Sequence, residues 1–473
     1  MEQTLYLPDL LYAGIAREGI GLLVNEDGNV AAYATPESAP GATVVRLTGK
    51  ALFPGLANAH SHAFQRLFRT RAEGRTALGR ANGSDTFWTW REQMYRAAVF
   101  VSPEAMYDIA RAVYLEMLAS GITVVGEFHY LHNSPDGTPY ADPNELALTL
   151  IRAAQSVGIR IVLLRSAYLR AGFNLPPHPG QRRFYETEDA YLHNLDALLS
   201  AAANQPQVTI GSAPHSIRAV PLDTLKRIYA FARDRNLPVH IHLSEQLAEN
   251  EACIAEYGHT PLTLLAENGI LHHTTLIHAI HMTETEFEQT GRAGAHICSC
   301  PTTERNLGDG IFPADTAARL GIPVCYGTDS QAQIDILEDA RQNEYHLRLI
   351  QRQRGILDGI HGEIGPHLLH CATAWGYSAL GLHGGLLHPG SGKLADWLAQ
   401  PADFFTADLN DLALLGADKE SLATQAVFAL GRTAIRDVAV AGKLILVDGH
   451  HADEEVICNR YKSVQSQFAQ EAP

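Results

Sequence analysis

The chain has 473 residues, of which 46% are hydrophobic and 19% charged, so it can bury a large core and is not a disordered segment. Lys and Arg number 36 against 52 Asp and Glu, a net charge of −16 that disfavours nucleic acid and anionic membrane surfaces as partners. The six cysteines form no C-x-x-C pair, which predicts neither a disulfide framework nor a cysteine zinc ribbon. The chain shows no basic leader followed by an apolar run and no apolar stretch of membrane-spanning length, so a cytoplasmic protein is expected.

Three segments of different periodicity follow one another. Residues 1–51 read as short strands separated by turns. Residues 52–389 hold apolar runs that alternate with amphipathic helical stretches, a pattern typical of a parallel sheet covered by helices. Eight such units predict a TIM-type (β/α)8 barrel as the fold of this segment. The eight runs cover residues 53–57, 122–127, 159–164, 208–212, 239–243, 275–280, 293–298 and 322–327.

The third segment, residues 390–473, returns to strands and turns and ends in a predicted helical tail from about residue 461. Each terminal segment is too small to bury a core alone. Because both are rich in strands, we expect them to pair into one small β-sandwich beside the barrel. The predicted domains are therefore 1–51 and 390–473 for the two parts of the sandwich, and 52–389 for a metal-dependent catalytic barrel.

Two histidines close the first apolar run, in the string Asn58-Ala59-His60-Ser61-His62. Residues at i and i+2 of a strand project to the same face, so both imidazoles are predicted to point into the barrel. The functional groups of a TIM barrel lie at the carboxyl ends of its strands, which is where this pair falls. Two neutral imidazoles on one face suit a divalent transition metal, although an H-x-H pair alone is a weak signal.

Further ligand-type residues follow three other runs: His242 and Glu245 the fifth, His278 the sixth, and Asp329 the eighth. In a barrel all of these strand ends converge on the same mouth as the first. A core histidine bonded to a backbone carbonyl would explain one such residue, but not the same pattern on four strands. The sequence therefore predicts a metal centre. His281, His129 and His132 are expected to be structural, and His240, one layer deeper on the face of His242, either to pack in the core or to support a ligand.

On these residues the chain resembles the amidohydrolase superfamily, in particular its mononuclear deaminase branch. The resemblance implies a TIM barrel with a small β-sandwich from both termini and one divalent metal ion per chain, with Zn²⁺ the expected ion. It implies His60, His62, His242 and Asp329 as metal ligands, Asp329 with His278 as acceptor of the proton of the attacking water, and Glu245 as the acid that protonates the leaving nitrogen. The fourth run is followed by no lysine, so a binuclear centre with a carbamylated lysine is not expected.

Longer strings resemble the formimidoylglutamate deiminase family. That resemblance implies hydrolysis of the C=N bond of N-formimidoyl-L-glutamate to N-formyl-L-glutamate and ammonia in histidine catabolism, and a homodimer. The substrate contacts that it implies are Gln65, Arg91, Tyr130, His215 and Arg218. Two arginines suit a small dicarboxylate, because guanidinium groups bind carboxylates bidentately. The strings are 60–66 (HSHAFQR), 86–96 (TFWTWREQMYR), 127–130 (EFHY), 214–218 (PHSIR), 242–246 (HLSEQ) and 301–304 (PTTE); the stretch 330–335 (SQAQID) has no assigned match.

Two alternatives stay open. Another mononuclear deaminase of the same superfamily could act on an aminated heterocycle, which calls for aromatic stacking and no paired arginines. A non-catalytic barrel could serve as an assembly scaffold, but such a protein is expected to lose metal ligands, and every expected ligand is present here.

Overall fold

The computed structural model describes residues 3–71, 73–74, 87–358, 363–382 and 397–471. Within these ranges, eight parallel strands pair in chain order. Ser61 at the end of the first also pairs with Asp329 beyond the last, so the sheet curls into a barrel. The predicted barrel is therefore confirmed. Its strands are β6 (Leu56–Ser61), β7 (Ile122–His129), β8 (Arg160–Ala167), β9 (Val208–Pro214), β10 (Val239–Leu243), β11 (Thr274–His278), β12 (His296–Ser299) and β13 (Val324–Tyr326).

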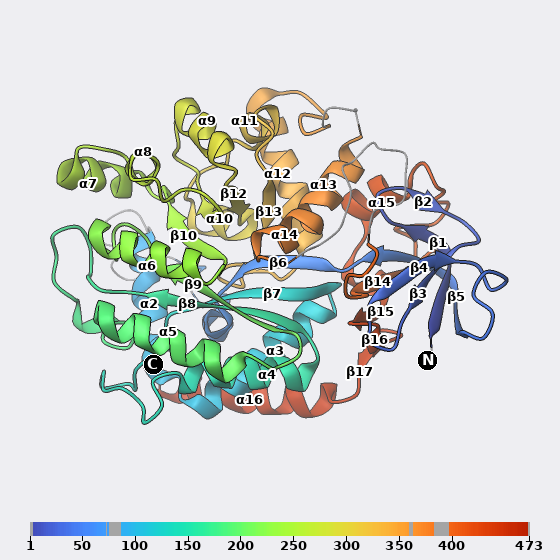
Figure 1. The fold of residues 1–473 in the computed structure, drawn as a ribbon, viewed down its shortest axis with the longest axis horizontal. Helices are drawn as coiled ribbons and strands as arrows, with labels where there is room; N and C mark the ends of the chain where they lie inside the picture. Colours follow the sequence, from blue (N-terminus) through green and yellow to red (C-terminus); the bar gives the residue numbers. More distant parts are fainter. Residues whose placement is uncertain (1–2, 72, 75–86, 359–362, 383–396, 472–473) are drawn as a thin grey trace.

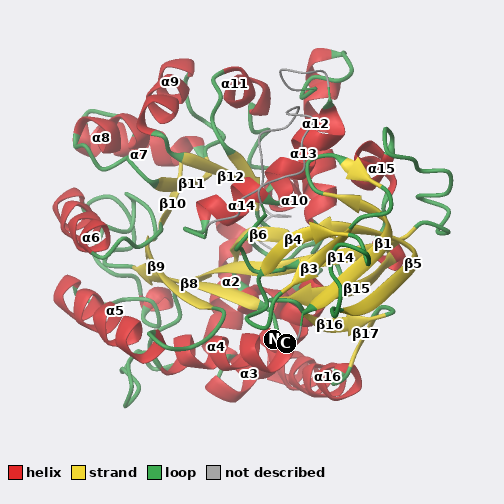
Figure 2. Ribbon diagram, turned by 45° about the vertical axis from the view of Figure 1, so that its right-hand side comes forward, coloured by secondary structure: helices red, strands yellow, loops and turns green. Residues whose placement is uncertain are grey.

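Helices cover the outside of the barrel (Figures 1 and 2). α4, for example, buries an apolar stripe with Leu146, Leu150 and Ile151 and packs on β8. The outer helices are α3 (Pro103–Leu118), α4 (Glu145–Val157), α5 (Glu188–Ala202), α6 (Leu222–Asp234), α8 (Pro261–Glu267), α9 (Glu284–Ala293), α11 (Ala314–Arg319), α12 (Ile336–Gln351) and α13 (Ile364–Ala372). The short helix α14 (Ala374–Ala379) closes the amino end of the barrel, where the Ala379 carbonyl accepts from the Thr275 hydroxyl at 3.2 Å. The βα connections add η1 (Ala63–Phe68), α2 (Phe87–Phe100), η2 (Pro179–Gln181), α7 (Leu247–Tyr257) and α10 (Pro301–Leu307).

A second sheet joins the two ends of the chain, as predicted, and lies beside the barrel (Figure 1). Its central pairing is antiparallel, between β5 and β14, where the rings of Phe53 and Phe405 stack 5.1 Å apart. Its nine strands are β1 (Thr4–Tyr12), β2 (Ala16–Arg17), β3 (Gly21–Val24), β4 (Val30–Ala34), β5 (Thr43–Pro54), β14 (Phe404–Asp408), β15 (Ile435–Val440), β16 (Lys443–Val447) and β17 (His450–His451). Two helices and a 3₁₀ turn complete this part: α15 (Leu422–Ala429), η3 (Arg432–Ala434) and α16 (Glu454–Glu471), which packs along α3.

The passage from the terminal sheet to the barrel runs through Pro54 and Gly55. The first predicted apolar run spans this point, whereas in the structure β5 continues to Pro54 and β6 begins at Leu56. Gly55 lies so close to the Thr123 side chain that a Cβ there would meet its Oγ1 at 2.0 Å. The other predicted boundary, at residue 390, falls outside the described residues. None of the described helices is long and apolar enough to cross a membrane.

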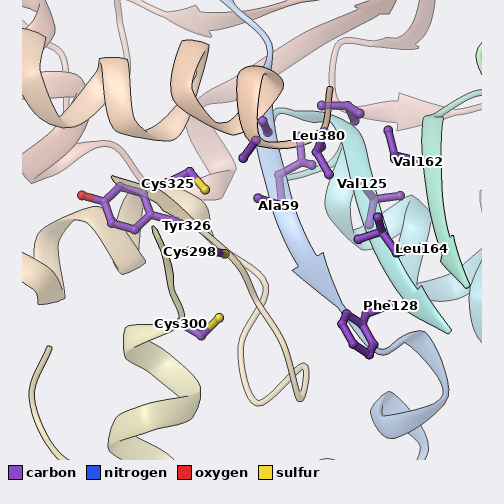
Figure 3. Close-up of a cluster of buried hydrophobic side chains, with 14 of the residues drawn as sticks. Ala59, Val125, Phe128, Val162, Leu164, Cys298, Cys300, Cys325, Tyr326 and Leu380 are labelled. Carbon is purple, nitrogen blue, oxygen red and sulfur yellow. The ribbon is translucent and has the colours of Figure 1, made fainter. Parts of the chain in front are cut away.

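The barrel interior is filled with side chains below the mouth. Figure 3 shows Phe128 of β7 and Val162 and Leu164 of β8 among them. His240, on β10, is also buried there, with Nε2 2.8 Å from the carbonyl oxygen of Ala379. This packed layer forms a floor, so chemistry is confined to the carboxyl ends of the strands.

Candidate active site

Four predicted metal ligands meet at the barrel mouth: His60, His62, His242 and Asp329. Oδ1 of Asp329 lies 3.3 Å from Nε2 of His60 and 3.3 Å from Nε2 of His62. Nε2 of His242 lies 3.2 Å from Nε2 of His60. All four side chains are buried, so one ligand atom from each converges on a single point shielded from bulk water.

The hydrogen bonds of these imidazoles show which ring nitrogen carries the proton and which one faces the other ligands. Nδ1 of His62 faces the carbonyl oxygen of Phe128 at 2.8 Å, and Nδ1 of His242 faces that of His215 at 3.0 Å. A carbonyl can only accept, so each Nδ1 carries the proton and each Nε2 presents a lone pair. Burial lowers the pKa of all three histidines, that of His62 to about 3, so they are neutral. Lone pairs and a carboxylate held this close repel one another unless a cation lies between them, so the residues fit a divalent metal ion.

The backbone sets the register of this cluster. The amide N–H of Asp329 donates to the carbonyl of His60 (2.9 Å), and that of His62 donates to the carbonyl of Asp329 (3.0 Å). The carboxylate is thereby fixed between the two histidines of the H-x-H pair. Burial would raise the pKa of Asp329, but the neighbouring His60, His62 and His278 hold it below its usual range.

A second group of ionisable side chains surrounds His278. Its Nε2 lies 3.7 Å from Oε1 of Glu245 and 3.8 Å from Oδ2 of Asp329, and its Nδ1 lies 3.3 Å from Oε1 of Glu304. Burial alone would lower the pKa of His278, but these carboxylates raise it to about 10. Burial raises the pKa of Glu245, which favours its protonated form. The arrangement thus places a proton donor and a proton acceptor beside the four clustered side chains of the candidate metal site (the metal cluster).

Glu304 was not assigned a role from the sequence. The backbone N–H of Cys300 donates to its Oε1 at 2.7 Å, and the Ser299 hydroxyl donates to its Oε2 at 3.2 Å, so the carboxylate is held facing His278. The only signal was its place at the end of the 301–304 string, where nothing pointed to a particular partner.

All five residues implied as substrate contacts line one pocket together with Glu245, His278 and Asp329: Gln65, Arg91, Tyr130, His215 and Arg218. Arg91 comes from α2 and Arg218 from the loop after β9, so two guanidinium groups reach the pocket from different elements. The Gln65 amide donates to the Tyr130 hydroxyl (2.8 Å), which fixes both side chains. The pocket therefore combines two fixed cations with the metal cluster.

The remaining wall of this pocket is largely aromatic and apolar, and it was not predicted as a whole. Gln181 donates from its amide to the hydroxyls of both Tyr95 (3.1 Å) and Tyr168 (2.8 Å), and the Tyr168 ring lies 4.7 Å from that of His215. The added lining residues are Trp90, Met94, Tyr95, Tyr168, Phe184 and Leu307. In the 86–96 string, Thr86 and the side chains of residues 87–89 lie outside the described residues.

The histidines expected to be structural lie outside the metal cluster. Nε2 of His132 contacts the carbonyl oxygen of Ser166 at 2.8 Å, and Nε2 of His281 contacts that of Asp309 at 2.9 Å. His129 packs edge-on against His132, with ring centroids 5.4 Å apart.

Comparison with known proteins bears on this geometry. The model of the amidohydrolase family matches residues 51–445. The chain belongs to this family. This amidohydrolase is 40% identical over 452 residues to formimidoylglutamate deiminase of Pseudomonas aeruginosa, a match that covers 94% of this chain and 95% of that one. The resemblance seen in the sequence motifs is thereby confirmed.

Two further relatives place this amidohydrolase more widely. It is 27% identical to 5-methylthioadenosine/S-adenosylhomocysteine deaminase of Teredinibacter turnerae, over 83% of this chain and 80% of that one. The crystal structure of an amidohydrolase from Brucella melitensis superposes with a TM-score of 0.88 at 32% identity, covering 99% of this chain and 100% of that one.

Proposed function

We propose that this amidohydrolase hydrolyses the C=N bond of N-formimidoyl-L-glutamate to give N-formyl-L-glutamate and ammonia, a step of histidine catabolism. The observation that carries the proposal is the presence of Arg91 and Arg218 in one pocket with the metal cluster. Two positive groups are needed to bind the two carboxylates of such a substrate. Because the net charge of the chain is −16, they must be local cations in the pocket. The relative that shares 40% of its residues carries the same activity in its name.

The proposal includes one divalent metal ion per chain, Zn²⁺ being the expected ion, held by His60, His62, His242 and Asp329. When bound, such an ion supplies an activated water at neutral pH, because it lowers the pKa of that water from 15.7 to about 7. The backbone carbonyls that orient His62 and His242 are the kind of partner that fixes metal-ligating histidines.

The chain's own side chains move the protons. Asp329, next to His278, accepts the proton of the attacking water. Glu245, whose pKa is raised by burial, delivers a proton to the imino nitrogen. The proton held by Asp329 then passes to the same nitrogen while Glu245 takes up the proton of the new C–OH group, so the C–N bond breaks, the formyl C=O forms and ammonia leaves. Positioned proton transfers of this kind typically contribute about 10²–10⁴-fold to the rate. His278 lies between the two carboxylates and holds them apart.

Arg91 and Arg218 each bind one carboxylate of the substrate. The Gln65–Tyr130 pair and His215 line the same pocket, and they are proposed to contact the amidine end. A charge-assisted, bidentate contact on each carboxylate would select a dicarboxylate over a neutral substrate.

The test is a panel of candidate substrates with purified, metal-loaded enzyme. Release of ammonia from N-formimidoyl-L-glutamate, with N-formyl-L-glutamate as the co-product by mass spectrometry, is the expected result. A higher kcat/KM on a neutral aminated heterocycle would overturn the substrate assignment and leave the metal-dependent deaminase chemistry standing.

The aromatic wall favours one second candidate, a deaminase acting on a heterocyclic ring. Tyr95, Tyr168 and Phe184 could stack on such a ring, and a relative at 27% identity is a nucleoside deaminase by name. The paired arginines weigh against it, because a neutral ring leaves both without a ligand. The same substrate panel separates the two.

A homodimer and a cytoplasmic location complete the proposal, and light scattering on a size-exclusion column tests the assembly.

A further inference from the structure

The structure assigns Gln331 as a positioning residue that fastens Asp329 to the H-x-H strand, so that the metal ion is retained. This role rests on the proposed metal site, but concerns the residues behind it. Gln331 lies in the 330–335 stretch for which the sequence offered no match. Its side chain is fully buried and does not line the substrate pocket.

Asp329 needs this support because of its position at the point where the barrel closes. The ligands of the proposed metal lie on both sides of the seam between β6 and β13, with His60 and His62 on one side and Asp329 on the other. β13 ends at Tyr326, so Asp329 lies in the loop beyond the strand and not within a ladder. The Ser61–Asp329 bridge joins the two sides at this level. Movement of this loop would separate the carboxylate from the imidazoles.

The Gln331 amide spans the seam. Its Nε2 donates one hydrogen bond to the hydroxyl of Ser61, which lies between the two histidines, at 2.9 Å. It donates a second bond to the backbone carbonyl of Asp329 at 3.0 Å. Its Oε1 accepts from the hydroxyl of Thr328 at 2.9 Å. One side chain thus joins the strand that carries His60 and His62 to the loop that carries Asp329.

The neighbouring hydrogen bonds determine which group donates and which accepts between Gln331 and Ser61. The Ser61 hydroxyl, which accepts from Gln331, donates to Glu127 Oε2 at 2.7 Å, and the other carboxylate oxygen accepts from the amide of Ala63 at 2.7 Å. These two contacts fix the residues that flank His62. Because the Ser61 hydroxyl gives its hydrogen to Glu127, its oxygen acts as the acceptor toward position 331, and a side chain there must donate to form the link.

On its other side this series of hydrogen bonds ends at Asn58 of β6. The Asn58 amide donates to the Thr328 hydroxyl at 2.7 Å, and its carbonyl accepts from the Thr328 backbone N–H at 3.0 Å. Every member is buried, so a broken link leaves unpaired polar groups out of reach of water.

The backbone of the loop also has to be held. Asp329 and Gln331 adopt left-handed conformations, with φ of +46° and +61°, which residues other than glycine adopt at a cost. Such conformations persist where surrounding contacts impose them. The Gln331 bond to the Asp329 carbonyl joins the two strained residues directly.

The experiment measures how fast the metal ion leaves. Gln331→Glu and Gln331→Leu are loaded with Zn²⁺, and its transfer to a colorimetric chelator is followed at 25 °C. Glu keeps the size of glutamine but, even when protonated, has one hydrogen to donate where the Gln331 amide donates two, and Leu removes the polar group. Gln333→Leu is the matched control, because Gln333 is exposed two residues further on. Both Gln331 variants should release zinc about 10- to 100-fold faster than wild type, the range seen when partners of metal ligands are removed, and the control at the wild-type rate.

A merely structural role would give a different pattern. It would lower the unfolding temperature of the metal-free protein and leave the release rate of the folded, loaded protein unchanged. Ser61→Ala should accelerate release as well, and the double variant Ser61→Ala/Gln331→Leu should be no faster than the faster single one, since one link is lost. If Gln331→Leu fails to fold, Gln331→Glu and Ser61→Ala still decide the matter. Wild-type release rates in these variants would overturn the assignment.

The outcome is separate from that of the proposed reaction. An enzyme that retains zinc through Gln331 but ignores N-formimidoyl-L-glutamate refutes the substrate alone. An enzyme that turns over this substrate with zinc release insensitive to position 331 refutes the role of Gln331 alone. A wild-type chain that binds no metal under loading conditions refutes both.

Discussion

Replacing Arg218 by methionine tests the substrate assignment most directly. Arg218 is half-buried in the pocket wall, where Tyr168, Glu249 and Glu245 act against the desolvation of its guanidinium and raise its pKa. A carboxylate about 4 Å from a guanidinium gains about 4 kcal/mol at an effective dielectric constant of 20. Removing one partner of a buried charge pair typically costs about 2–5 kcal/mol. Arg218→Met should therefore lower kcat/KM for N-formimidoyl-L-glutamate by roughly 30- to several-thousand-fold.

The assay is ammonia release at low substrate concentration, with zinc content measured on the same samples. Arg227→Met serves as the control, because Arg227 lies on α6 with an exposed side chain and should leave kcat/KM unchanged. N-formimidoyl-2-aminobutyrate lacks the side-chain carboxylate, so it should be a poor substrate of the wild type. It should also be nearly insensitive to whichever variant, Arg218→Met or Arg91→Met, has lost the partner of that group. Wild-type kcat/KM in both arginine variants would refute the reasoning.

Four further outcomes follow from the site. A chelator should abolish activity and Zn²⁺ restore it, and His60→Ala should lose metal and activity together; full activity in metal-free protein would contradict the mechanism. Glu245→Gln should keep its metal but lose several orders of magnitude in kcat, whereas an effect on KM alone would indicate substrate binding. Glu304→Gln keeps an acceptor for His278 but removes a charge, so kcat should fall by about 10- to 100-fold with KM little changed; an unchanged kcat would count against its role. Burial raises the pKa of Glu249 to about 7, so the folded chain holds a proton that the unfolded chain releases near pH 4.5, and stability falls as pH rises between these values. Urea unfolding of Glu249→Gln should therefore show a shallower fall over this range, and an identical slope would refute it.

The barrel was predictable because its strands are buried on both faces. Such strands read as continuous apolar runs, and the helices between them keep a helical period. The metal cluster was predictable for a related reason: in a barrel, position in sequence at the end of a strand fixes position in space at the mouth. His60 and Asp329 are 269 residues apart, yet the fold alone brings them together.

Strand ends were less predictable, because they depend on tertiary contacts. The first apolar run hides the change of sheet at Pro54, since β5 and β6 are both buried there. The sixth run was expected to reach residue 280, but β11 ends at His278, where His278 and Ala279 adopt positive φ. The terminal helix begins at Glu454 and not near residue 461. The prediction placed its start too late because the first turn is charged and shows little apolar pattern.

Partners that come from different loops left no local signal. Glu304 is defined by His278, and Gln331 by Ser61, pairs that only the closed barrel brings together. The aromatic wall is similar: Phe184 follows no recognisable motif and reaches the pocket from a long βα connection. The sequence therefore indicated the four residues that cluster at the mouth, whereas the side chains that support them are brought together only by the fold.

The pairing of β5 with β14 has a consequence for synthesis on the ribosome. β5 ends at Pro54 and its partner begins at Phe404, so the 349 residues 55–403 lie between them in the chain. At about 5–20 residues per second, roughly 20–70 s pass before β14 can emerge. During that time the edge of β5 that carries Leu52 and Phe53 is unpaired, and the barrel is being made next to it. An open apolar edge can pair with another chain, so nascent protein is expected to depend on chaperones until its last strands arrive.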